Sequence, residues 1–189
     1  AANRALQLFS AMLLMAKDRS WIDSEPAKDI TKFQEDERHR YLSDAEITKL
    51  LKVLDDEKTN PNSKIIRLIF TTGSRKSEVL AARWRDFDLE KGVWFKKAAD
   101  TKQKKISYIP LNSEALAVVK ELKRNILSAK KLEDCKELIV SNEEYLFYNP
   151  ETKTHVKDLK AFWKKLCTSA GIKNARIHDL RHTFASILV

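Results

Sequence analysis

Residues 177–188 read IHDLRHTFASIL, and their apolar members recur at the spacing of an amphipathic helix. Spacings of three, four and seven predict one buried face. Its members are Ile177, Leu180, Phe184, Ile187 and Leu188. The polar residues His178, Arg181 and His182 share a second edge. Arginine binds phosphate oxygens through paired hydrogen bonds and histidine transfers protons near neutral pH, so this edge suits a phosphate site. The alternative is that these residues solvate the outer surface of an ordinary helix.

The composition is that of a compact, helix-rich protein with a basic surface. The 189 residues include 43% hydrophobic side chains but only 3 glycines and 4 prolines, which excludes a disordered chain. The 36 Lys and Arg residues exceed the 27 Asp and Glu residues, so the net charge is +9. This excess is spread along the chain and favours a polyanionic partner, nucleic acid first. A basic surface without such a partner is the alternative.

Several classes of protein are excluded by features that the sequence lacks. No apolar run reaches the length of a membrane span, and the most apolar window, residues 6–16, is interrupted by Gln7 and Ser10. No secretory signal is visible. Cys135 and Cys167 are far apart and lack metal-ligand spacing, which is typical of a reducing cytoplasm. We therefore expect a cytoplasmic protein without a metal or cofactor.

The first forty residues predict the end of one domain and a linker. Residues 3–22 have an amphipathic helical pattern that stops before Pro26. Because this helix begins without a cap, we expect residues 1–27 to be the last helix of a domain whose beginning is missing. Residues 28–40 are dominated by charge without any period and predict an exposed linker. The main domain is expected over residues 41–189.

The main domain opens with strong helix signals. Ser43 and Glu46 have the spacing of a capping box at the start of a regular apolar stripe. Residues 65–70 are apolar almost all round, which predicts a central helix.

A turn at Gly73, where that central helix ends, leads to a second candidate for phosphate binding. Ser74 is placed to cap the next helix, which puts Arg75 in its first turn, where free backbone N–H groups attract anions. Glu78 lies on the same face and can hold the guanidinium group of Arg75. The alternative is an exposed Arg–Glu pair that contributes only about 0.2–0.5 kcal/mol.

From Trp84 onward the hydrophobic period changes to two. Residues 84–89, 93–95 and 106–111 predict a small antiparallel sheet of three short strands. Helical patterns return at residues 112–126 and 158–170. The predicted fold class is therefore α+β, mostly helical, with a small three-stranded antiparallel sheet.

The connection between the second and third strands is rich in lysine. Its lysines are Lys96, Lys97, Lys102, Lys104 and Lys105. We expect that five such side chains cannot pack inside, so that they either solvate the hairpin tip or contact a phosphate backbone. A lysine-rich tip also discourages pairing between sheet edges, which is an alternative explanation.

Two sequence boxes resemble those of the tyrosine recombinase family, the integrases of phages, prophages and other mobile elements. The first is TGSRKSEVL at residues 72–80, followed by Trp84 and DFD at residues 86–88. The second is HDLRHTFA at residues 178–185. Both boxes occur in the family's order.

Two further stretches extend the resemblance over nearly all of the chain. Thr101-Lys102 ahead of YIPL at residues 108–111 is similar to the family's catalytic-lysine hairpin. ANRAL at residues 2–6, with Trp21-Ile22 and Pro26-Ala27, is similar to the end of the core DNA-binding domain that precedes catalysis. The resemblance thus assigns residues 1–27 to that domain and implies an integrase-type catalytic domain over residues 41–189.

The resemblance implies site-specific DNA recombination or integration through a 3′-phosphotyrosyl intermediate. Arg75 and Arg181 would clamp the non-bridging oxygens of the scissile phosphate. Lys102 would protonate the leaving 5′-oxygen, and His178 would assist proton transfer. Glu78 falls where the family supports its first arginine.

The resemblance also implies the partners of the protein. These would be double-stranded DNA at attachment sites and further copies of the enzyme in a tetrameric synapse. We expect additional DNA contacts from Lys76, Lys104, Lys105 and His182. Two fixed guanidinium groups can stabilise phosphoryl transfer without a metal or a nucleotide, and the sequence has no P-loop motif.

The sequence departs from the family pattern in two places. Its four tyrosines, Tyr41, Tyr108, Tyr145 and Tyr148, all precede the second box, and none is a credible nucleophile. We therefore expect a monomeric piece of a recombinase, truncated at both ends, that cannot cleave DNA by itself. Ile106 stands where a basic residue is expected, so the choice among Lys102, Lys104 and Lys105 as the catalytic lysine stays open.

Three other functions are compatible with parts of the pattern. A type IB topoisomerase would use a similar phosphate clamp, but the N-terminal match and the small size favour an integrase. A non-catalytic DNA-binding protein would use the basic surface only to occupy DNA sites, without reacting with the DNA. A metallohydrolase using His178 and His182 is disfavoured, because Arg181 between them would repel a divalent cation.

Overall fold

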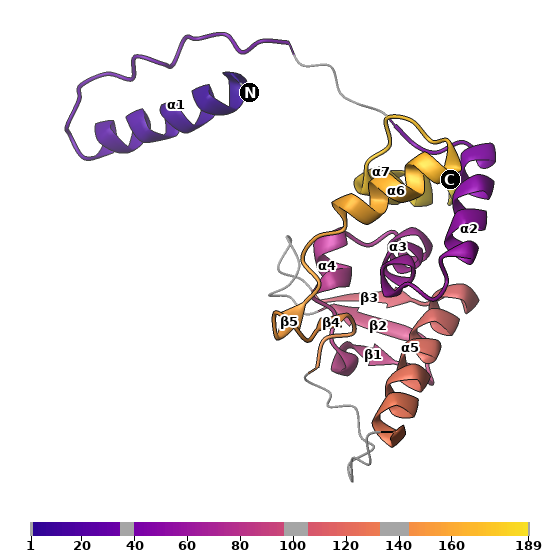
Figure 1. Cartoon of the computed structure of the whole chain (residues 1–189). Helices are drawn as coiled ribbons and strands as arrows, with labels where there is room; N and C mark the ends of the chain where they lie inside the picture. Colours follow the sequence, from indigo (N-terminus) through magenta and orange to yellow (C-terminus); the bar gives the residue numbers. More distant parts are fainter. Residues whose placement is uncertain (1, 35–39, 97–105, 133–143, 189) are drawn as a thin grey trace. The chain divides into compact units, whose positions relative to one another are not determined.

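The computed structural model describes residues 2–34, 40–96, 106–132 and 144–188. The chain divides into two compact units, Ala1–His39 and Arg40–Val189. The first unit contains α1 (Ala2–Asp18), drawn in indigo in Figure 1. The side chain of Asn3 exchanges two hydrogen bonds of 2.8 Å with the backbone of Phe33. The assignment of residues 1–27 to a DNA-binding domain and of residues 28–40 to a linker stays a prediction.

The second unit is built around α3 (Pro61–Thr72), as the apolar run at residues 65–70 predicted. Ile65, Ile66, Leu68 and Ile69 of this helix are fully buried. It packs against α7 (Ile177–Ile187), α5 (Ser113–Leu132) and the short α4 (Lys76–Leu80). The capping box of Ser43 and Glu46 at the start of α2 (Asp44–Asp56) is confirmed, and α2 packs on α6 (Lys160–Ala170).

The predicted three-stranded antiparallel sheet is confirmed. Its order is β1 (Phe87–Asp88), β2 (Val93–Lys96) and β3 (Ser107–Pro110). Trp94 is opposite Phe87 on one side and Ile109 on the other. Figure 1 shows α5 lying beside this sheet, with α2, α6 and α7 at the opposite end of the unit and α3 and α4 between.

The first strand is shorter than predicted, because Trp84–Asp86 form a 3-10 helix, η1. The Asp86 carboxylate accepts a hydrogen bond of 2.9 Å from the backbone N–H of Arg83, and this local bond favours a turn over an extended strand. A second sheet, β4 (Tyr148–Asn149) with β5 (Thr154–His155), was not predicted, because two-residue strands carry no measurable alternation.

The last helix, α7, is confirmed, but its buried face differs from the prediction. Leu180 is fully buried as expected, whereas Ile187 and Leu188 are 58% and 71% exposed. Thr183 is fully buried instead. Its hydroxyl accepts a hydrogen bond of 2.9 Å from the backbone N–H of Leu42 and donates one to the Asp179 carbonyl. A polar side chain with both bonding capacities satisfied can occupy a core position at low cost.

None of the described helices is both long and apolar enough to cross a lipid bilayer. The described part of unit two has one contiguous apolar core. It includes residues of both the helices and the sheet, such as the buried Val119 of α5 and Trp94 of β2.

Candidate phosphate-binding site

The turn between α3 and α4 positions the first predicted arginine. Gly73 adopts the left-handed conformation, with φ of 61°, and ends α3 as predicted. The N-cap of α4 is Arg75 rather than Ser74, so the prediction was wrong by one residue. The reason is that the Ser74 hydroxyl bonds with Thr72 at 2.8 Å and is buried, so it is not available to cap the helix.

Glu78 holds Arg75 at two points. One carboxylate oxygen, Oε2, accepts a hydrogen bond of 2.9 Å from the backbone N–H of Arg75. The other, Oε1, accepts a hydrogen bond of 2.8 Å from the guanidinium Nη1. The Arg75 side chain is 41% exposed, whereas that of Glu78 is 9% exposed. Glu78 therefore fixes one side of the Arg75 guanidinium group, and the exposed part of the group is accessible to a ligand.

The second predicted arginine reaches the same turn from the other end of the chain. Arg181, on α7, donates a hydrogen bond of 2.5 Å from Nη1 to the carbonyl oxygen of Gly73, 108 residues away. The ring of Phe184, one turn later, lies against the α-carbon of Gly73. The structure therefore places Arg181 at the glycine turn that directly precedes α4 and its N-cap residue, Arg75.

His178 and His182 lie on the outer edge of α7, next to Arg181. Their rings are 4.9 Å apart between centroids and perpendicular. Partial burial lowers the pKa of His178, and electrostatic interactions with His182, Arg181 and Arg75 add to this effect, while Asp179 opposes it. His178 is therefore mostly neutral at pH 7, a state in which its ring both donates and accepts hydrogen bonds.

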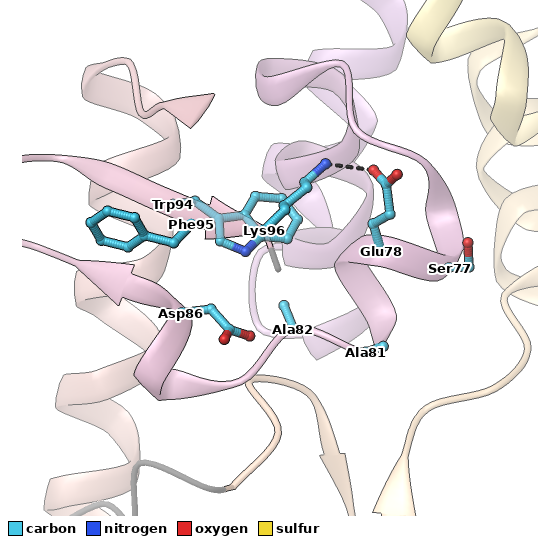
Figure 2. A pocket seen from close by; sticks show the side chains of 8 residues that line it. All are labelled: Ser77, Glu78, Ala81, Ala82, Asp86, Trp94, Phe95 and Lys96. Atoms are coloured by element: carbon cyan, nitrogen blue, oxygen red, sulfur yellow. Dashed lines mark hydrogen bonds and ion pairs between the residues drawn. The ribbon is translucent and has the colours of Figure 1, made fainter. Parts of the chain in front are cut away.

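Lys96, the last residue of β2, is buried in this site, contrary to the expectation that all five lysines of the hairpin stay outside. Only 8% of it is exposed. Its ammonium group donates hydrogen bonds to Ser74 Oγ at 3.0 Å and to Glu78 Oε2 at 2.5 Å. It also lies 4.4 Å from the centroid of the Trp94 ring. Figure 2 shows Lys96 extending past Trp94 toward Glu78.

The sequence analysis missed Lys96, although the alternation of the strand could have identified it. Trp94 and Lys96 are two residues apart in β2, so they point to the same face of the sheet. A buried Trp94 therefore predicts an inward Lys96, but the count of nearby lysines pointed the other way.

The site contains more positively charged than negatively charged side chains, and these groups shift the pKa values of Glu78 and Lys96. Burial raises the pKa of Glu78, but hydrogen bonds from Lys96 and Arg75 outweigh this effect and keep the pKa below its ordinary value. Burial lowers the pKa of Lys96; the contact with Glu78 opposes this, while Arg181 and Arg75 add to it. Among the described residues, Lys96 and Arg75 both contact the Glu78 carboxylate, and Arg181 is near enough to lower the pKa of Lys96. These positive charges suit an anionic ligand.

A cavity of about 230 Å³ lies behind Glu78 and Lys96 (Figure 2). Its lining consists of Ser77, Glu78, Ala81, Ala82, Asp86, Trp94, Phe95 and Lys96. Both partners of the buried ion pair therefore border this cavity on the sheet side of α4.

The remaining predicted residues of the site are lysines. Lys76 directly follows Arg75 and is half-buried. Lys102, Lys104 and Lys105 lie outside the described residues. The described residues contain no group of three or more His, Cys, Asp or Glu side chains that could hold a metal ion.

The chain is similar to proteins of one family. The family model described as the phage integrase family matches residues 40–189. The integrase of Salmonella phage P22 is 27% identical over 199 aligned positions, which cover 100% of this chain and 47% of that protein. A probable integrase/recombinase of Acholeplasma phage L2 is 31% identical over 126 positions, covering 66% of this chain and 38% of that protein. The chain thus spans half or less of the length of these relatives.

Solved structures share the fold. The Tn1549 transposon integrase in complex with transposon right end DNA has a TM-score of 0.74 at 19% identity, covering 99% of this chain and 66% of that one. The XerH site-specific recombinase bound to difH substrate has a TM-score of 0.64 at 23% identity, covering 97% of this chain and 52% of that one. Both have the arrangement of helices and sheet seen here.

Proposed function

The chain belongs to the phage integrase family, and from this premise we propose that it carries the phosphate-binding part of a tyrosine recombinase. The intact enzyme recombines double-stranded DNA at specific attachment sites through a 3′-phosphotyrosyl intermediate, in the cytoplasm and as a tetrameric synapse. The observation that carries this proposal is the convergence of Arg75 and Arg181 on the Gly73 turn. DNA as the partner is supported by the net charge of +9 and by the DNA-bound integrase and recombinase of the same fold.

In the proposed reaction, Arg75 and Arg181 bind the two non-bridging oxygens of the scissile phosphate. A tyrosine oxygen attacks the phosphorus, the bond from phosphorus to the 5′-oxygen breaks, and Lys102 donates a proton to that oxygen. His178 assists proton transfer, since its neutral ring can accept or donate. Arginine suits this role because its planar fork matches two phosphate oxygens and keeps its charge at every working pH.

We propose that none of the four tyrosines of the chain is the nucleophile of this reaction. The Tyr145 hydroxyl accepts a hydrogen bond of 3.0 Å from Arg83, and the Tyr108 ring packs edge-on against Phe95. Tyr41 and Tyr148 are exposed. We therefore expect the 189-residue polypeptide to bind DNA without cleaving it.

The test is the formation of covalent protein–DNA adducts by the product of the whole gene on a nicked attachment-site substrate. Arg181→Ala is expected to lower the adduct rate by roughly 100- to 1,000-fold, because it removes a donor that stabilises charge in the transition state. Arg75→Ala is expected to act similarly.

Arg124→Ala is the matched control, because Arg124 is an exposed arginine of α5. It should form adducts at the wild-type rate. Adduct formation at the normal rate by Arg181→Ala would refute the catalytic role. Relaxation of a plasmid without an attachment site would point to a topoisomerase instead.

A further inference from the structure

The buried ion pair of Lys96 and Glu78 suggests an additional functional residue. Resting on the proposed function, we propose that Lys96 is a positioning residue: it holds Glu78 in place, and Glu78 in turn fixes the guanidinium group of Arg75 for the scissile phosphate.

The hydrogen bonds form a connected chain from the sheet to the site. Glu78 Oε2 accepts from both Lys96 Nζ and the backbone N–H of Arg75, and Oε1 accepts from the Arg75 guanidinium. Lys96 Nζ also donates to Ser74, the residue before Arg75. One ammonium group thus contacts both the carboxylate that orients Arg75 and the turn that carries it.

The charge of Lys96 also matters for the strength of the phosphate site. A carboxylate paired with Arg75 alone would cancel much of the positive charge that this arginine offers to a phosphate. Lys96 compensates the charge of Glu78 from the buried side, so the positive charge of Arg75 stays available on the open side. The Lys96 side chain is 8% exposed, so water weakens this compensation little.

The surroundings of Lys96 hold it in this place. Its ammonium group lies against the Trp94 ring, and the buried Trp94 is itself stacked on Phe87 with ring centroids 5.2 Å apart. Because sheet residues with few free rotations support Lys96, the position of Glu78 depends on the sheet as well as on α4. Such support is what a phosphate site requires, since a displacement of about 1 Å can lower a rate by roughly 100-fold.

The main test compares Lys96→Met with wild type in adduct formation by the product of the whole gene at saturating DNA. Methionine retains a flexible apolar stem beside Trp94 but removes the charge. We expect a rate lowered by roughly 10- to 100-fold, with DNA affinity changed less than about threefold. Lys96→Arg, which keeps the charge and donors, should recover most of the rate. Lys120→Met, at an exposed lysine of α5, is the matched control and should leave the rate unchanged.

A pH profile separates positioning from mere structural support. In wild type, Lys96 helps to keep Glu78 ionised. In Lys96→Met, the burial of Glu78 favours its protonated form, so the adduct rate should fall on the acidic side at a higher pH than in wild type. A profile that is only scaled down, with the same shape, would overturn the proposal.

A double variant distinguishes the loss of the Lys96–Glu78 interaction from poor folding of Lys96→Met. Glu78→Gln with Lys96→Met leaves neither charge unpaired in the interior, so it should fold even if Lys96→Met does not. If Lys96 acts through Glu78, the double variant should be no slower than Glu78→Gln alone. A further loss would overturn the proposal.

If Arg181→Ala is inactive while Lys96→Met equals wild type, only this inference fails, whereas an active Arg181→Ala refutes the proposed function itself.

Discussion

At the scale of single residues, Gly73 is the position on which the site depends most. Its left-handed backbone ends α3, its carbonyl oxygen accepts the hydrogen bond from Arg181, and its α-carbon contacts the Phe184 ring. A residue without a Cβ satisfies all three conditions, because a side chain would strain the backbone and collide with the ring.

We predict that Gly73→Ala lowers the free energy of unfolding by about 2–5 kcal/mol, the sum of backbone strain and overpacking. Gly171→Ala is the matched control. It has a similar φ of 66°, but a Cβ there would meet no atom within 4 Å. It should cost only the backbone term, about 1–2 kcal/mol. Urea denaturation of the 189-residue chain measures both, and equal losses would contradict a role for Phe184.

At the scale of elements, the position of α7 beside the start of α2 depends on polar contacts. The Leu42 backbone bonds to Thr183, as described above. Arg40, at the start of unit two, donates two hydrogen bonds to Glu46 and one to the carbonyl oxygen of Lys173. These contacts connect the beginning of α2 to the loop before α7, and α7 carries Arg181.

The Arg40–Glu46 pair predicts a pH dependence of stability. The hydrogen bond from Arg40 lowers the pKa of Glu46 from 4.5 to about 2. A carboxyl group with a lowered pKa stabilises the folded state above pH 4.5, and this contribution is lost as the pH falls toward 2. Glu46→Gln should therefore lower the free energy of unfolding by about 2 kcal/mol at pH 7 and progressively less below pH 4.5.

The measurement is urea denaturation of both proteins between pH 7 and pH 3. Glutamine can take the place of glutamate in a capping box, so the difference reports the ion pair and not the cap at Ser43. A difference that stays constant with pH would contradict this assignment.

At the scale of the whole molecule, the net charge of +9 predicts how the chain meets DNA. Each phosphate neutralised by a Lys or Arg side chain releases counterions, so affinity falls with the logarithm of the salt concentration. In the proposed site, Arg75 and Arg181 are two of the charges that would neutralise a phosphate.

We predict that the 189-residue chain binds double-stranded DNA weakly, and that its affinity falls between about 50 and 200 mM salt. The variant Arg75→Ala/Arg181→Ala should reduce the slope of log affinity against log salt by about 2, roughly one for each arginine that no longer neutralises a phosphate. Fluorescence anisotropy with a labelled duplex measures this slope, and Arg124→Ala serves as the control. Affinity independent of salt would contradict DNA-backbone binding.

Much of the fold and part of the site could be predicted from the sequence. The helices, the three-stranded sheet, the glycine turn and the two boxes that carry Arg75 and Arg181 all follow from spacing within short windows, because periodicity and capping are local properties. The family followed from the order of those boxes.

Only the tertiary structure decided which polar groups find partners. The burial of Thr183, the engagement of the Ser74 hydroxyl away from the N-cap, and the inward position of Lys96 each involve a contact with a residue at least 18 positions away in the chain. A local pattern indicates which face of an element is apolar, but a buried charge or hydroxyl is stable only where a distant partner satisfies it. This requirement explains why Lys96, one of five neighbouring lysines in the sequence, is buried in the structure, where Glu78 and Ser74 accept its hydrogen bonds.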